Sequence, residues 1–180
     1  MKRVAILSWP LGGNTRLVAD KLIRQFTFYN EEDIKAEKLD FLSVSEGKLR
    51  PFDVIIIGGS TVETEDNWLK ADETTKWSTF FDIIRFADLT GKKAAVFAIG
   101  NQKAYPDNFA DGMSELKTVL EQKGAKIIGH WPTDDYDFFD SRSIEGEKFI
   151  GLVIDQENQP ELTDRRIIDW VDQLVVEIGN

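Results

Sequence analysis

The chain has 180 residues, of which 42% are hydrophobic, and its formal net charge is −10. This length suits one compact domain with its own core, and every apolar run is far shorter than the roughly 20 residues that cross a bilayer. The lack of cysteine excludes disulfides and thiolate metal sites, and a single histidine leaves few ligands for zinc or iron. The acidic balance repels nucleic acid and anionic membranes and favours basic protein partners. We therefore expect one soluble domain spanning residues 1–180, with any redox chemistry supplied by an organic cofactor.

The first residues, MKRVAILSW, carry positive charge but lack the pattern of a signal peptide. Their apolar stretch soon reaches Pro10, Gly12 and Gly13 without a small-residue cleavage site. We therefore expect a cytoplasmic protein.

Apolar runs with the length of buried strands alternate along the chain with segments of helical period. The predicted strands are residues 3–8, 34–39, 52–57 and 94–99, and a fifth strand that begins at Ala125. The predicted helices are residues 15–26, 77–86 and 108–122, and a last helix after Pro160. This alternation is typical of a parallel sheet covered by helices on both faces.

The fifth strand is interrupted. Residues 131–148 are polar and aromatic, and residues 149–154 then return to an apolar, strand-like pattern. We expect an insertion in the fifth strand rather than a second domain.

Three loops follow the carboxyl ends of predicted strands, which is where doubly wound sheets bind ligands. They are residues 9–14, 58–75 and 100–107. In the first loop, Gly12 and Gly13 let the backbone approach a ligand, and the amides of the next helix attract phosphate, with Thr15 as a further donor. The alternative is a tight turn in which Asn14 or Thr15 caps the helix. The loop lacks GK[ST] and GxGxxG, so ATP and NAD folds lose support.

Three segments carry a family resemblance. They are GNQKAYPDNFADGM (residues 100–113), GHWPTDDYDFFDS (residues 129–141) and FIGLVIDQENQPELTDRRIIDWVDQL (residues 149–174). They resemble the loop after the fourth strand, the inserted loop, and the final strand and helix of the long-chain flavodoxins, and the similarity extends over essentially the whole chain.

The resemblance implies a flavodoxin-like α/β fold, a doubly wound five-stranded parallel sheet of order 2-1-3-4-5 with an insertion in strand five. It also implies a monomeric, low-potential electron carrier without substrate turnover, holding one non-covalent FMN and moving electrons from a flavodoxin reductase to acceptor enzymes. Tyr105 takes the place of the tyrosine that stacks on the outer face of the isoalloxazine ring. The cofactor-binding positions implied are Pro10, Leu11, Gly12, Gly13, Asn14, Thr15, Ser60, Thr61, Val62, Gly100, Asn101, Tyr105 and Asn108.

The sequence departs from the family at two cofactor loops. The phosphate loop of the family reads roughly [ST]-x-T-G-x-T, and residues 10–15 lack two of its hydroxyl donors, for which Asn14 or Ser8 are candidate substitutes. In the loop after the third strand, Val62 stands where the family has an aromatic partner of the flavin, and the loop is several residues longer. Trp68 in that extension either replaces the aromatic or packs at the rim of the sheet. We expect the redox potentials of the flavin to differ from those in a typical member of the family.

Other polar residues receive structural or surface roles. His130 has no serine or cysteine partner and is expected to be structural. Acidic residues between positions 63 and 66 are solvated charges that could help dock a basic reductase. A further acidic group alternates with aromatic residues, as in a surface loop without metal: Asp134, Asp135, Asp137 and Asp140.

Three other functions remain open. A response-regulator receiver shares this strand order but needs acidic residues after the first and third strands, where this chain has residues 8–11 and 58–61. A flavin-dependent quinone reductase would require a substrate pocket for which the sequence has no signature. The strongest alternative is a flavodoxin-like scaffold with weak or lost FMN binding that acts as a protein-interaction module, because both departures fall on cofactor loops.

Overall fold

The computed structural model describes residues 1–180 except 10–11, 30–31, 61–80, 83 and 85. The main sheet has the order β2-β1-β3-β4-β5, all of its pairings are parallel, and β9 also pairs with β4. Its strands are β1 (Lys2–Trp9), β2 (Ile34–Lys38), β3 (Val54–Ser60), β4 (Lys93–Ile99), β5 (Lys126–Ile127) and β9 (Leu152–Ile154). The predicted fold class and strand order are therefore confirmed.

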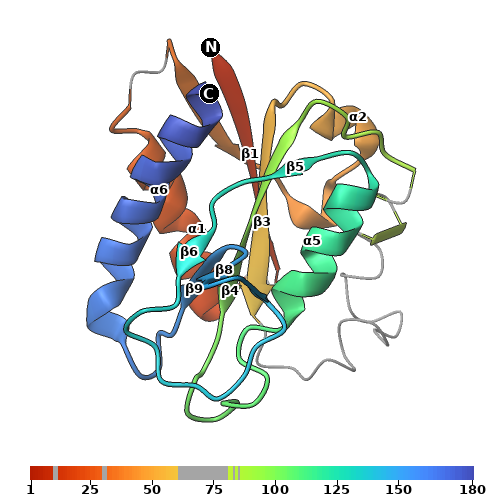
Figure 1. Cartoon of the computed structure of the whole chain (residues 1–180). Coiled ribbons are helices and arrows are strands. Elements are labelled where there is room, and N and C mark those ends of the chain that lie inside the picture. Colours follow the sequence, from red (N-terminus) through yellow and green to blue (C-terminus); the bar gives the residue numbers. More distant parts are fainter. Residues whose placement is uncertain (10–11, 30–31, 61–80, 83, 85) are drawn as a thin grey trace.

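Helices cover the two faces of this sheet (Figure 1). On one face lie α1 (Gly13–Phe26) and α6 (Thr163–Gly179), which pack against each other. On the other face lie α2 (Glu46–Leu49) and α5 (Gly112–Gln122). Two short 3-10 helices, η1 (Phe41–Ser43) and η2 (Pro160–Leu162), precede α2 and α6. Neither η1 nor α2 is among the predicted helices.

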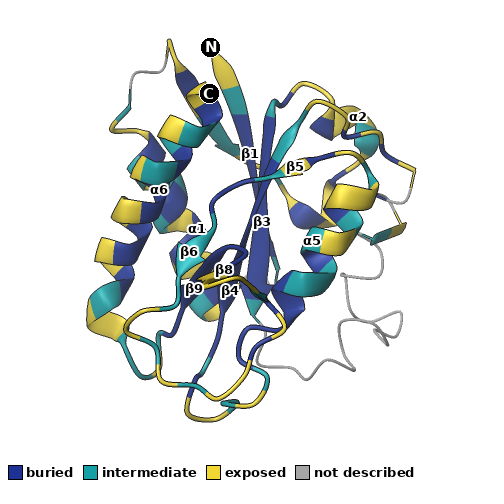
Figure 2. Ribbon diagram, in the orientation of Figure 1, coloured by how far each residue is buried: buried dark blue, intermediate teal, exposed yellow. Residues whose placement is uncertain are grey.

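Each face of the sheet has its own hydrophobic core because the central strands are apolar on both sides. Figure 2 shows that these strands are buried along most of their length. Alternate residues of β1 illustrate this, since Leu7 belongs to the core under α5 and Ile6 to the core under α1 and α6. The largest fully buried side chain is Trp170 of α6, whose Nε1 donates to the carbonyl of Gly129 at 2.7 Å. This packing holds the carboxyl ends of the strands in fixed positions.

The interruption of the fifth strand is confirmed, but its second half begins later than predicted. β5 pairs with the start of β4 and β9 with its end. Between them, β6 (Trp131–Pro132), β7 (Ile144–Glu145) and β8 (Lys148–Phe149) form a small antiparallel sheet. Phe149 therefore belongs to the insertion, because it packs its ring against Phe109, Tyr136 and Phe138.

Helix α5 begins at Gly112, four residues after the predicted start at Asn108. The intervening backbone bonds to the insertion instead: Phe109 N donates to the Asp140 carbonyl at 3.2 Å, and Phe139 N donates to the Pro106 carbonyl at 2.7 Å. Ala110 has φ +59°, a left-handed conformation that interrupts a helix. The insertion thus determines where α5 starts.

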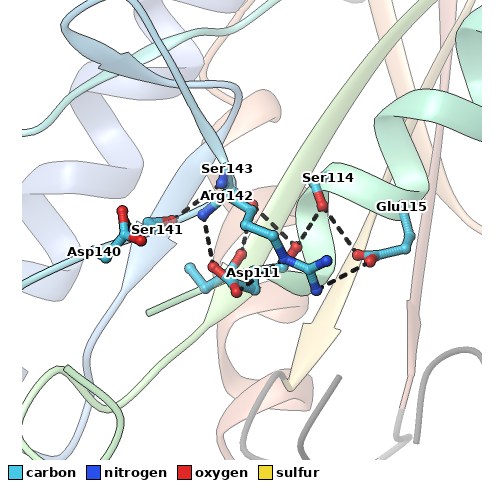
Figure 3. A network of polar contacts seen from close by, with 8 residues as sticks. Asp111, Ser114, Glu115, Asp140, Ser141, Arg142 and Ser143 are labelled. Carbon is cyan, nitrogen blue, oxygen red and sulfur yellow. Dashed lines mark hydrogen bonds and ion pairs between the residues drawn. The ribbon is translucent and has the colours of Figure 1, made fainter. Parts of the chain in front are cut away.

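The buried Asp111 joins the insertion to the first turn of α5 (Figure 3). Its carboxylate accepts from Arg142 N at 2.7 Å and from Arg142 Nε at 3.2 Å, while Arg142 Nη2 lies 3.4 Å from Glu115. Ser143 Oγ donates to the Ala110 carbonyl at 2.7 Å. Asp111 is therefore occupied by the insertion and does not cap the helix.

The boundaries of the third strand also differ from prediction. β3 begins at Val54 and runs to Ser60, three residues beyond the predicted end, because Gly58 and Gly59 continue the pairing with β4. The predicted helix 77–86 lies largely outside the described residues. Within the described part of the chain, no helix has the length and apolar character needed to cross a membrane.

Candidate functional site

A cavity of about 300 Å³ opens at the carboxyl edge of the sheet, between the start of α1 and the turn after β9. Its position is the one expected for a ligand site in a doubly wound fold. The lining residues are Gly12, Gly13, Asn14, Thr15, Ser60, Ile99, Gly100, Gln156 and Glu157. Six of the thirteen implied cofactor positions therefore lie around one space.

The first loop leaves the amides at the start of α1 open. Gly12 is the N-cap residue, no side chain caps the helix, and its first turn contains no acidic residue. The proposal that Asn14 or Thr15 caps α1 is wrong, since both residues lie inside the first turn. The first amides of a helix have no partner within it, and together with the helix dipole they attract an anion. Pro10 and Leu11 lie outside the described residues.

The two glycines of this loop lie next to open space. A Cβ atom added at Gly12 or at Gly13 would meet nothing within 4 Å. Gly13 also has φ +58°, which an L side chain adopts only with strain, whereas Gly12 is extended at φ −121°. The chain therefore turns into α1 while its backbone faces the cavity.

Thr15 supplies a hydroxyl to the cavity lining. The residue is only 2% exposed, and within the described part of the chain its Oγ1 bonds to no protein group. A hydroxyl held in this way is available to a ligand. Ser8, a possible substitute donor, is 3% exposed and is not among the lining residues.

At the ends of β3 and β4, Ser60 and Gly100 reach the cavity. Gly100 has a second role, because a Cβ added there would lie 2.6 Å from the buried ring of Phe109. Thr61 and Val62 lie outside the described residues, as do Trp68 and the acidic residues between positions 63 and 66.

The remaining positions of the loop after β4 lie away from the cavity lining. Asn101 Oδ1 accepts from Ala104 N and from Asn158 Nδ2, both at 2.9 Å, so its oxygen is used within the protein. Tyr105 is half-buried, and its amide donates to the Asn101 carbonyl at 3.0 Å. Asn108 is half-buried, and its carbonyl accepts from Asp111 N.

Sequence reasoning missed the turn after β9. Asp155 is fully buried, and its carboxylate accepts from Gln102 N and Asn158 N at 2.9 Å each. Gln156 and Glu157 then enter the cavity lining. A signal was present, because the polar run DQENQ follows the last predicted strand and must therefore lie at the same edge as the other loops.

His130 and two acidic residues of the insertion, Asp135 and Asp137, bond to other protein groups. His130 Nε2 lies 3.3 Å from Glu145 Oε2 and is absent from the cavity lining. In the insertion, the Asp135 carbonyl accepts from Gln159 Nε2 at 2.5 Å, and Asp137 N donates to Gln102 Oε1 at 2.6 Å. Among the described residues, no group of three or more His, Cys, Asp or Glu side chains is arranged to hold a metal ion.

The sequence and the fold both match those of known flavodoxins. The flavodoxin family profile matches residues 6–170. A flavodoxin of a Picosynechococcus species is 36% identical over 179 residues, covering 99% of both chains, and one of Synechococcus elongatus is 31% identical with the same coverage. The crystal structure of Fusobacterium nucleatum flavodoxin bound to flavin mononucleotide superposes with a TM-score of 0.81 at 28% identity, covering 98% of this chain and 99% of that one. The chain belongs to the flavodoxin family.

Proposed function

We propose that the cavity at the carboxyl edge receives the phosphate of one non-covalently bound FMN. Family membership gives the broader function: the protein is an FMN-carrying electron-transfer protein, and it is an electron carrier rather than an enzyme with a substrate of its own. FMN, when bound, supplies the redox chemistry by accepting and donating electrons, and the protein supplies binding and orientation.

The observation that carries the proposal is the set of unused donors at the start of α1. The uncapped amides of the first turn, the open space at Gly12 and Gly13, and the Thr15 hydroxyl all border one cavity. These groups are donors without a positive side chain, as suits a phosphate held by amides and a hydroxyl. The residues present therefore fit the phosphate end of the cofactor.

We further propose that Tyr105 stacks on the outer face of the flavin ring and that Asn101 and Asn108 contact its edge. Support comes from their position on the loop after β4, which adjoins the cavity through Gly100. Thr61 and Val62 would contact the inner face. Because residues 10–15 lack two hydroxyl donors, each worth about 1.5–3 kcal/mol toward a charged group, we expect weaker binding than in a member that has them.

Family membership also implies redox partner proteins. We propose that these are basic proteins, a flavodoxin reductase and acceptor enzymes, because the chain has a net charge of −10 and a sequence pI of about 4.7. We also propose a monomeric, single-domain, cytoplasmic protein.

The test is a titration of the apoprotein with FMN, followed by stepwise anaerobic reduction. We expect binding of one FMN per chain, measured by quenching of flavin fluorescence, and two resolved one-electron reduction steps. Absence of binding at micromolar protein would contradict the proposal and would favour the alternative of a flavodoxin-like scaffold.

A further inference from the structure

The turn after β9 forms a wall of the cavity opposite the start of α1, and internal hydrogen bonds hold it in place. The buried Asp155 accepts from Gln102 N, from Asn158 N and from Asn158 Nδ2, and its carbonyl accepts from Gln159 N at 2.9 Å. The side chains that this turn presents to the cavity therefore start from a fixed backbone.

Gln156 is oriented by a buried neighbour. Its Oε1 accepts from Thr163 Oγ1 at 2.8 Å, and Thr163 is 3% exposed. With the oxygen fixed, the Nε2 group is the free end of the amide, and in the described part of the chain it donates to no protein group. Gln156 lines the cavity, and its Nε2 is a donor without a protein partner in the described part of the chain.

Glu157 brings a negative charge to the same cavity. Its Oε1 accepts from Asn14 Nδ2 at 3.4 Å, which links the turn to the first turn of α1. A phosphate that approached the start of α1 would compete with this carboxylate for the Asn14 amide and would be repelled by its charge. Glu157 is exposed, so salt would screen the repulsion.

We propose that Gln156 and Glu157 set the affinity of this cavity for a phosphomonoester in opposite directions, with Gln156 donating to the phosphate and Glu157 opposing it. The inference rests on the proposed function, since the phosphate is that of FMN. Gln156 supplies one donor where the phosphate loop lacks two of the family's hydroxyl groups. Glu157 lowers the preference of the site for the phosphorylated flavin over riboflavin, which carries no phosphate.

Two nearly isosteric substitutions test this in the full-length apoprotein. Glu157→Gln keeps an oxygen that can accept from Asn14 but removes the charge, and we expect FMN to bind about five to ten times more tightly at low salt. Gln156→Glu keeps the acceptor for Thr163 but replaces the donor with a charge, and we expect FMN to bind about ten times more weakly. The affinity for riboflavin should change in neither variant.

The matched control is Glu161→Gln. Glu161 is exposed and lies outside the cavity lining, so this substitution removes the same charge away from the cavity. It should leave both affinities unchanged, and the double variant Gln156→Glu/Glu157→Gln keeps the net charge, so any change in its FMN affinity is local. The inference is overturned if E157Q matches E161Q, or if FMN and riboflavin affinities change by the same factor. Failure of the unsubstituted chain to bind FMN would overturn the proposed function as well.

Discussion

The two walls of the cavity differ in how many of their polar groups are already paired within the protein. Among the described residues, no side chain caps the start of α1, the Thr15 hydroxyl has no protein partner, and Asn14 contacts the opposite wall at 3.4 Å. On the other wall, the buried Asp155 carboxylate alone accepts from three different nitrogen atoms. Residues 12–15 therefore form an open wall, and the turn of residues 155–159, which internal bonds to Asp155 hold in place, forms a paired wall.

The paired wall positions the side chains around the cavity, and the open wall supplies the donors that bind a ligand. The paired wall is fixed before any ligand arrives, so less ordering is needed on binding. The open wall keeps its donors unused, and unpaired groups of this kind are tolerated only where water or a ligand can reach them. Substitution of the buried Asp155, which holds the paired wall, should therefore change stability. Substitution of the donors in the open wall, or of Gln156 and Glu157 on the cavity side of the paired wall, should change mainly affinity.

The largest expected effect comes from breaking the paired wall at Asp155. Asp155→Ala leaves the amides of Gln102 and Asn158 without an acceptor, and we expect the free energy of unfolding of the apoprotein to fall by about 3 kcal/mol or more. FMN affinity should fall as well, because two loops lose their shared anchor. Urea denaturation and FMN titration measure the two effects, with Glu161→Gln as the exposed acidic control. An unchanged unfolding midpoint would contradict the distinction between the walls.

A smaller loss is expected at Gly100, which borders the cavity but is also limited by packing. Gly100→Ala would place a methyl group 2.6 Å from the ring of the fully buried Phe109, and overpacking of this kind costs about 1–3 kcal/mol. If the clash is the cause, Phe109→Leu should cost less stability in the Gly100→Ala background than alone. A double-mutant cycle of urea unfolding measures that coupling, and strict additivity would exclude the clash.

In the open wall, substitutions at Gly12 and Gly13 distinguish the effect of backbone strain on stability from the effect of filling the cavity on FMN binding. Gly13→Ala should lower the free energy of unfolding by about 1 kcal/mol because of its φ of +58°, whereas Gly12→Ala meets no such strain and should leave the apoprotein nearly unchanged. Both methyl groups enter the cavity side, so both variants should bind FMN more weakly. Equal stability of the two apoproteins would contradict the role given to the backbone angle.

The framework and the open wall could be predicted from the sequence because their signals are local. The apolar runs of β1 and β4 locate strands, and Gly12 and Gly13 mark a turn that leads into a helix. The paired wall could not be predicted in the same way. Asp155 gains its role from the amide of Gln102, 53 residues away, and such a long-range pairing leaves no periodic pattern in the chain.

The start of α5 shows the same limit. The sequence pattern alone predicted a helix from Asn108, although Ala110 is the one strong helix former among residues 108–111. The backbone bond from Phe109 N to the Asp140 carbonyl, together with the Asp111–Arg142 ion pair, outweighs that pattern. Tertiary contacts therefore decide a boundary that the sequence pattern places one turn too early.

Thr15→Val tests the open wall without changing its shape. The hydroxyl has no protein partner in the described part of the chain, so the stability of the apoprotein should change by less than about 0.5 kcal/mol. FMN should bind about five to ten times more weakly through loss of one hydrogen bond, and riboflavin should bind as before. Thr15→Ser, which keeps the hydroxyl, should restore most of the FMN affinity. A similar loss for riboflavin would instead indicate a packing defect.

The smallest effect is expected outside both walls, where Tyr29, just after α1, donates its hydroxyl to Asp172 of α6. Burial, aided by the Asp172 carboxylate, raises the pKa of Tyr29 to about 12. Because folding favours the neutral phenol, its contribution is complete below the unfolded pKa of about 10 and is lost as the pH rises from there to about 12. Tyr29→Phe should therefore show a shallower loss of stability than the native chain between pH 8 and pH 11, measured by urea unfolding. FMN affinity at neutral pH should be the same in both, since the residue lies outside the cavity lining, and a change there would mean that the open wall depends on the packing of α1 against α6.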